Sequence, residues 1–333
     1  MVSLGIGLTN NCNLNCAHCY RDQDVIYNLT LADIQNVCDN LDISSIGFGT
    51  GENGLNPEYF EILEFLQSRQ IKLTLASNGY TLSITPDETL KYFGDVEFSV
   101  DFPDQARQDE FRGEGNWKTV MEGIDRCRKL GIRVSILAVL MNLNYKDLGN
   151  VAKLAASFGS DFRVNAYQPM YTEAFMPSFE QYWKAYQILF DNSEIISVTE
   201  PLVNTFLGAN GLNGTPCGGQ SMRVTPDRKL KACVYWPDSD LTIDDLVDQK
   251  ETIFETPLFK QTHYTPQFCM DCEHVRNCGG GCAARRKLLH CFKEPDIYCP
   301  IYQKKKIRLD GQLSSAAKPL RTGSICTTIV RGI

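Results

Sequence analysis

The segment that decides the fold is residues 3–19, SLGIGLTNNCNLNCAHC, in which a short apolar run leads directly into three cysteines. The loose alternation of residues 3–9 predicts a first β-strand. The thiols of Cys12, Cys16 and Cys19 follow in the next loop, within a span of eight residues. Closely spaced cysteines in a chain without a secretion signal are typical of a metal site rather than of disulfides.

Further apolar segments follow the first strand, and each is separated from the next by a helical pattern. Thr30 and Asp33 have the spacing of a capping box, which predicts the start of the first helix. Pro57 and Pro86 predict two more helix starts, and helices are also expected at 116–130, 145–158 and 178–191. Strands that alternate with helices predict a parallel sheet with right-handed crossovers. The further predicted strands are 43–48, 71–76, 96–100, 132–140 and 162–167.

Polar motifs follow four successive predicted strands. The cysteine loop follows the first, Gly49-Thr50-Gly51-Glu52 the second, Ser77-Asn78-Gly79 the third, and Ser99-Val100-Asp101 the fourth. An open doubly wound sheet concentrates its site at one switch point, whereas a barrel collects the ends of all its strands. We therefore expect an α/β fold with a partial (β/α)6 TIM-like barrel. Candidates to line its mouth from the sixth strand are Arg163, Asn165, Tyr167 and Gln168.

The bulk composition excludes some classes of protein. The chain has 333 residues, of which 43% are hydrophobic, and this suits a barrel with an appendage. Its net charge of −7 disfavours a nucleic-acid binder. No apolar run approaches the roughly 18 residues of a membrane span, and the start lacks a basic leader and a cleavage site. We therefore expect a cytoplasmic protein without nucleic-acid or membrane partners.

A second group of cysteines lies in the carboxy-terminal half, where the strand–helix alternation has stopped. A single zinc site uses four ligands, and this group is larger, so a metal-held domain is expected. We divide the chain into a barrel (1–195), a cysteine-rich domain (196–302) and a loosely packed tail (303–333). Cys38 and Cys127 lie on apolar helix faces and are expected in the core, and Cys326 is unassigned. The second group comprises Cys217, Cys233, Cys269, Cys272, Cys278, Cys282 and Cys299.

The spacing Cys12-x3-Cys16-x2-Cys19 after a first strand resembles the signature of the radical S-adenosylmethionine (SAM) superfamily. The resemblance implies a [4Fe–4S] cluster on these three thiolates, with SAM chelating the fourth iron through its amine and carboxylate. Reductive cleavage of SAM would then give a 5′-deoxyadenosyl radical. From the residues alone, a zinc knuckle is the alternative. Positions that resemble the family's SAM contacts are Gly49, Gly51, Glu52, Ser77, Asn78, Ser99 and Arg112.

The pattern Cys269-x2-Cys272-x5-Cys278-x3-Cys282, followed by Cys299, resembles the SPASM domain that extends some radical SAM enzymes. The usual glycine before the second cysteine is missing from residues 227–232. A pair of structural zinc sites is the alternative. The resemblance implies two auxiliary [4Fe–4S] clusters, which makes three clusters in all. One auxiliary cluster would be held by Cys269, Cys272, Cys278 and Cys299. The other would be held by Cys217, Cys233 and Cys282. The fourth ligand of the latter is left open between a substrate group, a water and another residue, with Cys291 as the spare.

The resemblance implies an enzyme that abstracts hydrogen from a ribosomally made precursor peptide, leading to crosslinking, epimerisation or backbone excision. Val234 stands where sulfatase maturases carry an acidic base, which disfavours that activity. The chain begins at the first strand, so we expect leader recognition by the barrel or by a separate leader-binding protein. Flavodoxin or ferredoxin would supply electrons. The alternatives are a radical SAM enzyme acting on a tetrapyrrole or small metabolite, and a non-enzymatic zinc-binding protein.

Overall fold

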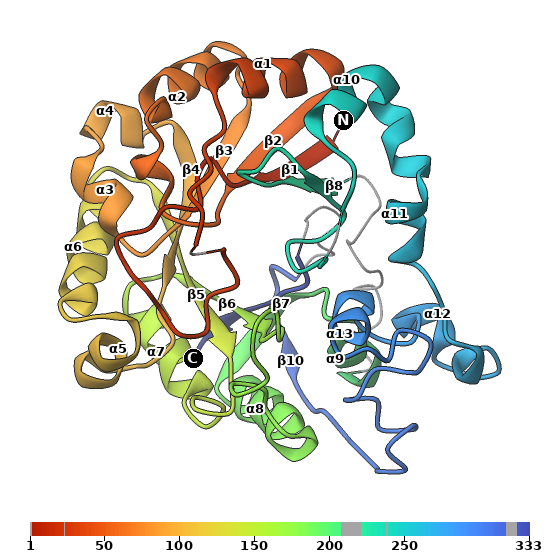
Figure 1. Ribbon diagram of the computed structural model, residues 1–333. Helices are drawn as coiled ribbons and strands as arrows, with labels where there is room; N and C mark the ends of the chain where they lie inside the picture. The colour runs from red at the N-terminus through yellow and green to blue at the C-terminus, as the bar shows by residue number, and fades with distance from the viewer. Residues whose placement is uncertain (1, 23, 208–220, 238, 318–324) are drawn as a thin grey trace.

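The computed structural model describes residues 2–22, 24–207, 221–237, 239–317 and 325–333. The first strands along the chain pair in parallel, each with the next, and curve into an incomplete barrel with helices outside (Figure 1). This confirms the predicted fold class. These strands are β1 Val2–Ile6, β2 Ile43–Phe48, β3 Lys72–Ser77, β4 Phe93–Ser99, β5 Arg133–Leu140 and β6 Asp161–Ala166.

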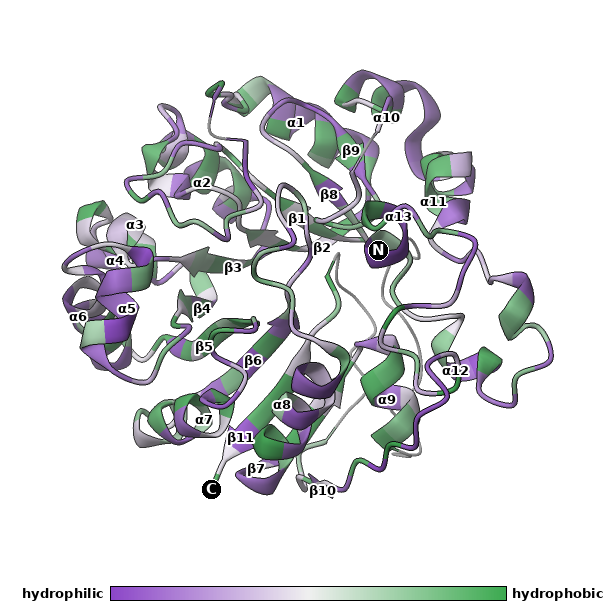
Figure 2. Cartoon of the chain, turned by 60° about the horizontal axis from the view of Figure 1, so that its bottom comes forward, coloured by the Kyte–Doolittle hydropathy of each residue, from purple (hydrophilic) through white to green (hydrophobic). Residues whose placement is uncertain are grey.

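The helices on the outside of the barrel are amphipathic. Figure 2 shows hydrophobic and hydrophilic residues on the same helices, and their apolar residues pack on the strands. The predicted capping box is present, because the Thr30 hydroxyl accepts from Asp33 N and the Asp33 carboxylate accepts from Thr30 N. The helices are α1 Leu31–Asn40, α2 Tyr59–Ser68, α3 Tyr80–Ile84, α4 Asp87–Leu90, α5 Gln105–Arg112, α6 Asn116–Lys129, α7 Leu148–Ser157 and α8 Phe179–Asp191.

The last described residues complete the sheet, so the prediction of a loosely packed tail is wrong for residues 325–333. Strand β11 (Thr328–Gly332) lies between β6 and β7 (Ser193–Val198) and is antiparallel to both. Thr328 and Val330 are fully buried. The physical reason is the β-branched run from Thr327 to Val330, which fits a pleated sheet better than a mobile tail. A further strand, β10 (Gln312–Leu313), pairs with β7.

The other edge of the barrel is extended by residues beyond the sixth unit. Strand β8 (Ser221–Val224) pairs in parallel with β1, and a hairpin joins it to β9 (Leu230–Lys231). Arg228 adopts a left-handed conformation in the hairpin turn, with φ 66°. An arginine thus takes the backbone conformation that the missing glycine would adopt more readily.

The cysteine-rich part has little regular structure and a small core of its own. Cys233, Val234, Tyr235, Trp236 and the start of α13 pack together as a separate apolar cluster. No helix within the described ranges is long and apolar enough to cross a membrane. The helices of this part are α9 Pro201–Leu207, α10 Ile243–Gln249, α11 Pro257–Gln261, α12 Val275–Cys278 and α13 Ala283–Leu288, with short 3-10 turns at Lys250–Glu255 and Gln267–Cys269.

Candidate active site and cysteine cavities

The carboxyl ends of the barrel strands surround a central cavity of about 420 Å³. The cavity collects side chains from the loops after β1, β2 and β3 and from the end of β4, where the polar motifs were predicted. Arg163, Asn165, Tyr167 and Gln168 also line it, as does Val234. The other predicted residues in its lining are Cys12, Cys16, Cys19, Gly49, Gly51, Glu52, Ser77, Asn78, Ser99 and Arg112.

Hydrogen-bond donors lie beside the sulfur of Cys12, and the Cys16 thiol donates to Arg112 O at 3.6 Å. Leu14 N and Asn78 Nδ2 each lie 3.5 Å from Cys12 Sγ, and Cys19 N donates to Cys16 O at 3.1 Å. Burial raises the pKa of Cys12 to about 11. Without a cation the thiol is therefore protonated, and a bound cluster would be held by thiolates that have released their protons.

The donor set fits an iron–sulfur cluster better than a single zinc ion. Within the described ranges, no group of three or more His, Cys, Asp or Glu side chains is arranged to hold one metal ion as it stands. Thiolates of a cubane each bind a different iron and stand further apart. His18, the nearby nitrogen donor, stacks on Phe111 at 4.8 Å between ring centroids. Burial lowers the pKa of His18 to about 4, so its ring is neutral.

Glu52 holds the loop after β2 against the loop after β3. Its carboxylate is almost completely buried and accepts hydrogen bonds from the Ser77 hydroxyl, from Thr81 N at 2.8 Å and from Asn78 N at 3.0 Å. Burial raises the pKa of Glu52, and these donors oppose the shift. Glu52 therefore fixes the positions of Ser77 and Asn78 at the cavity wall.

Gly51 lets the loop after β2 approach the cysteine loop closely. It has φ 61°, and Glu52 N donates to Asn11 O at 2.7 Å. A Cβ on Gly51 would lie 2.5 Å from both Asn11 O and Thr9 O. A side chain at this position would thus push the cysteine loop away from the sheet.

We expect Gly51→Ala to destabilise the fold by at least about 2 kcal/mol, because left-handed strain adds to the backbone clash, and to lower the iron content. Gly131→Ala is the matched control, since Gly131 has φ 71° but nothing within 4 Å of its added Cβ, and about 1 kcal/mol is expected there. Anaerobic denaturant unfolding and iron analysis measure both variants. Equal costs in the two variants would contradict the close approach described for Gly51.

Two of the four arginines that line the cavity, Arg112 and Arg223, differ in their partners. Arg112 Nε and Nη2 each lie 2.7 Å from Asp101 Oδ2, and Asp101 is fully buried. Arg223 comes from β8, and its Nη2 donates to Thr50 Oγ1 at 2.6 Å. In the part of the chain that the structure describes, Arg223 has no carboxylate partner and its Nε has no hydrogen-bond partner. Arg223 is therefore a buried cation available to an anionic group in the cavity.

Arg223 was missed by the sequence analysis. It lies in a segment rich in Gly, Asn and Pro, and β8 has only four residues, Ser221–Val224. The local signal, an arginine in a short apolar run, is weak. Only the pairing of β8 with β1 brings Arg223 to the mouth of the barrel.

The carboxy-terminal cysteines form two groups. Burial, and then the charges of Cys299 and Cys272, raise the pKa of Cys269 to about 11. Cys278 responds to the same neighbours, so these four thiols lie near one another. Cys233 and Cys282 line a second cavity of about 250 Å³ together with Cys278 and Cys326. Cys217 lies outside the described residues.

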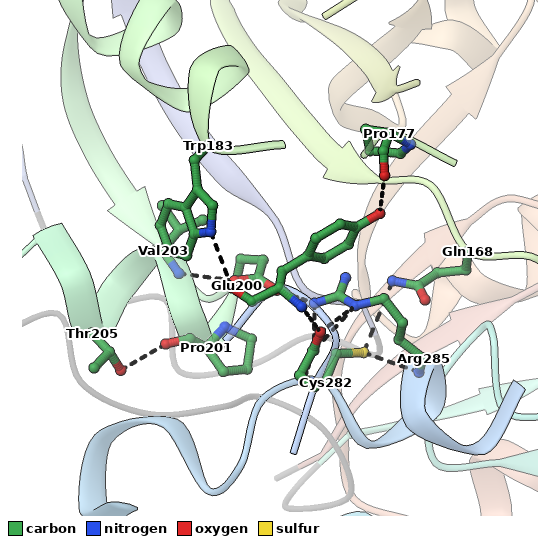
Figure 3. Close-up of polar contacts among 11 residues, drawn as sticks. Gln168, Pro177, Trp183, Glu200, Pro201, Val203, Thr205, Cys282 and Arg285 are labelled. Atoms are coloured by element: carbon green, nitrogen blue, oxygen red, sulfur yellow. Dashed lines mark hydrogen bonds and ion pairs between the residues drawn. The ribbon is translucent and has the colours of Figure 1, made fainter. Parts of the chain in front are cut away.

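A buried ionic network within the cysteine-rich part holds Cys282, and Gln168 reaches it from the barrel (Figure 3). Arg285 Nη2 lies 2.8 Å from Glu200 Oε1 and 2.6 Å from Asp296 Oδ2, and all three side chains are buried. Asp296 Oδ2 also accepts from Cys282 N at 2.8 Å. Gln168 Nε2, from the end of β6, lies 3.9 Å from Cys282 Sγ. The cysteine at the start of α13 is thus held by residues of both parts.

Residues 6–155 match the family model of the Radical SAM superfamily. The match supports SAM and a [4Fe–4S] cluster as the cofactors of this region, in agreement with the three-thiol loop and the cavity described above. These results confirm the family resemblance that the cysteine spacing gave.

Similarity to known proteins extends beyond the barrel. The chain is 23% identical over 305 residues to the mycofactocin maturase MftC of Mycobacterium tuberculosis H37Rv, covering 84% of this chain and 77% of that protein. It superposes on native anSMEcpe with bound AdoMet with a TM-score of 0.71 and 22% identity, covering 91% and 96% of the two chains. For Streptococcus suis SuiB bound to the precursor peptide SuiA, the TM-score is 0.61 at 15% identity, covering 90% and 75%. The fold is therefore shared across the cysteine-rich part.

Proposed function

We propose that this radical SAM enzyme is a maturase of a ribosomally made precursor peptide. The observation that carries the proposal is the central cavity, where the three-cysteine loop, the predicted SAM contacts and Val234 of the cysteine-rich part line one space. An enzyme that uses SAM needs such a water-restricted cavity beside the cluster. MftC is named a maturase, and SuiB was solved with its precursor peptide.

The residues of the cavity are proposed to hold the cluster and to contact SAM. Cys12, Cys16 and Cys19 would hold the cluster. When bound, the cluster and SAM supply a 5′-deoxyadenosyl radical that takes a hydrogen atom from the substrate. Glu52 orients Ser77 and Asn78 through its hydrogen bonds. The residues proposed to contact SAM are Gly49, Gly51, Glu52, Ser77, Asn78, Ser99 and Arg112.

A peptide substrate is favoured by the surface beside the cysteine loop. Tyr171 is 66% exposed, and its phenol responds to the charges of Asp22, Cys19 and Asp24, so it lies near that loop. Exposed apolar side chains next to a cavity are typical of a surface that binds another chain. The loop after the cysteines contributes Val25, Ile26 and Tyr27, each more than two-fifths exposed.

The cysteine-rich part is proposed to be a SPASM domain, residues 196–302, following a barrel of residues 1–195. One auxiliary [4Fe–4S] cluster would be held by Cys269, Cys272, Cys278 and Cys299, whose thiols lie near one another. The other would be held by Cys217, Cys233 and Cys282. Flavodoxin or ferredoxin is the proposed electron donor, and a separate leader-binding protein is a proposed partner.

Anaerobic incubation of the reconstituted chain with SAM, a reductant and a precursor peptide encoded beside its gene tests the proposal. We expect 5′-deoxyadenosine and a peptide of altered mass, and neither product when SAM is omitted. Release of 5′-deoxyadenosine with every neighbouring peptide unchanged would contradict the peptide substrate and favour a small metabolite. Colourless protein containing zinc would contradict the enzyme altogether.

A further inference from the structure

We propose that Cys326 is a ligand of the auxiliary cluster that Cys233 and Cys282 help to hold. The inference rests on the proposed function of the cysteine-rich part and names a ligand that the sequence pattern left open. Cys326 lies directly before β11, in a segment that carries none of the family spacings. It thus comes from beyond the predicted SPASM residues.

The second cavity brings together cysteines that are far apart in the sequence. Cys233 follows β9, Cys282 precedes α13, and Cys326 precedes β11, yet all three line the same space of about 250 Å³. Cys278 lines it as well, and the proposed function assigns that thiol to the neighbouring cluster. Thiols from three separate segments that face one cavity are a donor set suited to iron–sulfur ligation.

The side chain of Cys326 faces a different cavity from the side chains of its two neighbours. Its two neighbours, Ile325 and Thr327, line the central cavity of the barrel, whereas Cys326 between them lines the second cavity. Successive side chains of an extended chain point to opposite sides. Thr327 is fixed by Thr199, because Thr199 N donates to Thr327 O at 2.8 Å and Thr327 N to Thr199 Oγ1 at 2.9 Å. The sulfur is therefore positioned by the sheet.

A buried donor in the cavity also points to an acceptor there. Trp236 lines the cavity and is fully buried, and its indole N–H has no hydrogen-bond partner among the described residues. Leaving such a donor unpaired costs about 1–3 kcal/mol, and the sulfurs of a cluster are acceptors. Cys282 Sγ already accepts from Arg285 N at 3.5 Å. N–H groups directed at cluster sulfurs are a means of tuning the potential.

Cys291, the spare cysteine of the sequence pattern, is the competing candidate. It does not contribute to the lining of the second cavity, and its N–H donates to Arg286 O at 2.9 Å in the turn after α13. Cys326 therefore supplies a protein sulfur where a substrate group or a water would otherwise complete the cluster. Such a cluster is suited to electron transfer rather than to substrate binding.

The test compares Cys326→Ala with the control Cys291→Ala, each in the full chain that also carries Cys12→Ala, Cys16→Ala and Cys19→Ala. Because this parent lacks the three cysteines of the first loop, only auxiliary clusters contribute to its iron content and its spectrum. Electron paramagnetic resonance of the reduced proteins and iron analysis are the measurements. We expect Cys326→Ala to change or lose one of two cluster signals, with a fall of up to about four irons per chain, and Cys291→Ala to match the parent.

The outcomes separate the inference from the proposed function. A parent with auxiliary iron and a Cys326→Ala spectrum identical to it overturns the Cys326 ligand alone, whereas a parent without iron overturns both. Alkylation keeps the test valid if the alanine variant misfolds. In the wild-type chain, Cys326 should resist iodoacetamide until iron is chelated, as seen by peptide mass spectrometry. Equal labelling before and after chelation would overturn the inference.

Discussion

The triple variant Cys12→Ala, Cys16→Ala and Cys19→Ala should release no 5′-deoxyadenosine from SAM above the uncatalysed background. The expected loss is at least about 10⁶-fold, the lower end of enzymatic rate enhancements. All three thiols line the central cavity. Burial raises the pKa of Cys12 to about 11, so this thiol loses its proton when a cation is bound. Chromatographic assay of 5′-deoxyadenosine under anaerobic reduction measures the effect.

The control for the cysteine variant is Cys38→Ala, because Cys38 is a buried thiol on α1 within the hydrophobic core. It should keep its iron and its SAM cleavage, with a stability cost only. The triple variant should lose about four irons per chain and keep those of the carboxy-terminal part. Unchanged 5′-deoxyadenosine formation by the triple variant would refute the assignment of this loop to the SAM-cleaving cluster.

Asp296→Asn should destabilise the chain by about 3–5 kcal/mol, the usual effect of breaking a buried ion pair by removing one partner. Asp296 is fully buried, lies 2.6 Å from Arg285 Nη2 and accepts from Cys282 N. Among the described residues, the neutral amide leaves Arg285 with Glu200 as its one carboxylate partner. Because the amide has one acceptor oxygen in place of two, either Cys282 N or Tyr298 N loses its acceptor, and we also expect weaker retention of iron near α13. Anaerobic denaturant unfolding measures the change.

Asp310→Asn is the matched control for the charge change. Asp310 pairs with Arg308 at 2.9 Å, but both side chains are more than three-fifths exposed. Solvent screens such a pair, so the substitution should change stability by no more than about 0.5 kcal/mol. If the two variants unfold at the same denaturant concentration, the network around Arg285 does not stabilise the cysteine-rich part.

Local sequence patterns predicted the barrel well because each of its units is built from neighbouring residues. The apolar run 43–48 became β2 with the same bounds, and Thr30 begins α1 through its capping box. The strand ends also located the cavity, since parallel strands bring their carboxyl ends together. Here each prediction needed only the period of a strand or helix and the residues that end it.

The missed features all depend on contacts between distant segments. Strand β11 pairs Thr328 with Val164 of β6, and β8 pairs with β1 at the other edge of the barrel. Such pairing depends on tertiary context rather than on local propensity. Arg223 and Cys326 lie on or beside these strands, so neither position could be inferred from spacing. The sequence identified the cysteines that lie close together along the chain. Only the fold brings Cys326, from another segment, to the cavity of Cys233 and Cys282.

The wall between the two cavities is very thin. Cys233 faces the second cavity while its neighbours Val234 and Tyr235 face the first, and Ile325 and Cys326 divide in the same way. Under the proposed function, an electron that leaves the reacting substrate has a path of a few covalent bonds to the auxiliary centre. Tunnelling along such a path needs no contact with solvent. The peptide link between Val234 and Cys233 would then be part of that path.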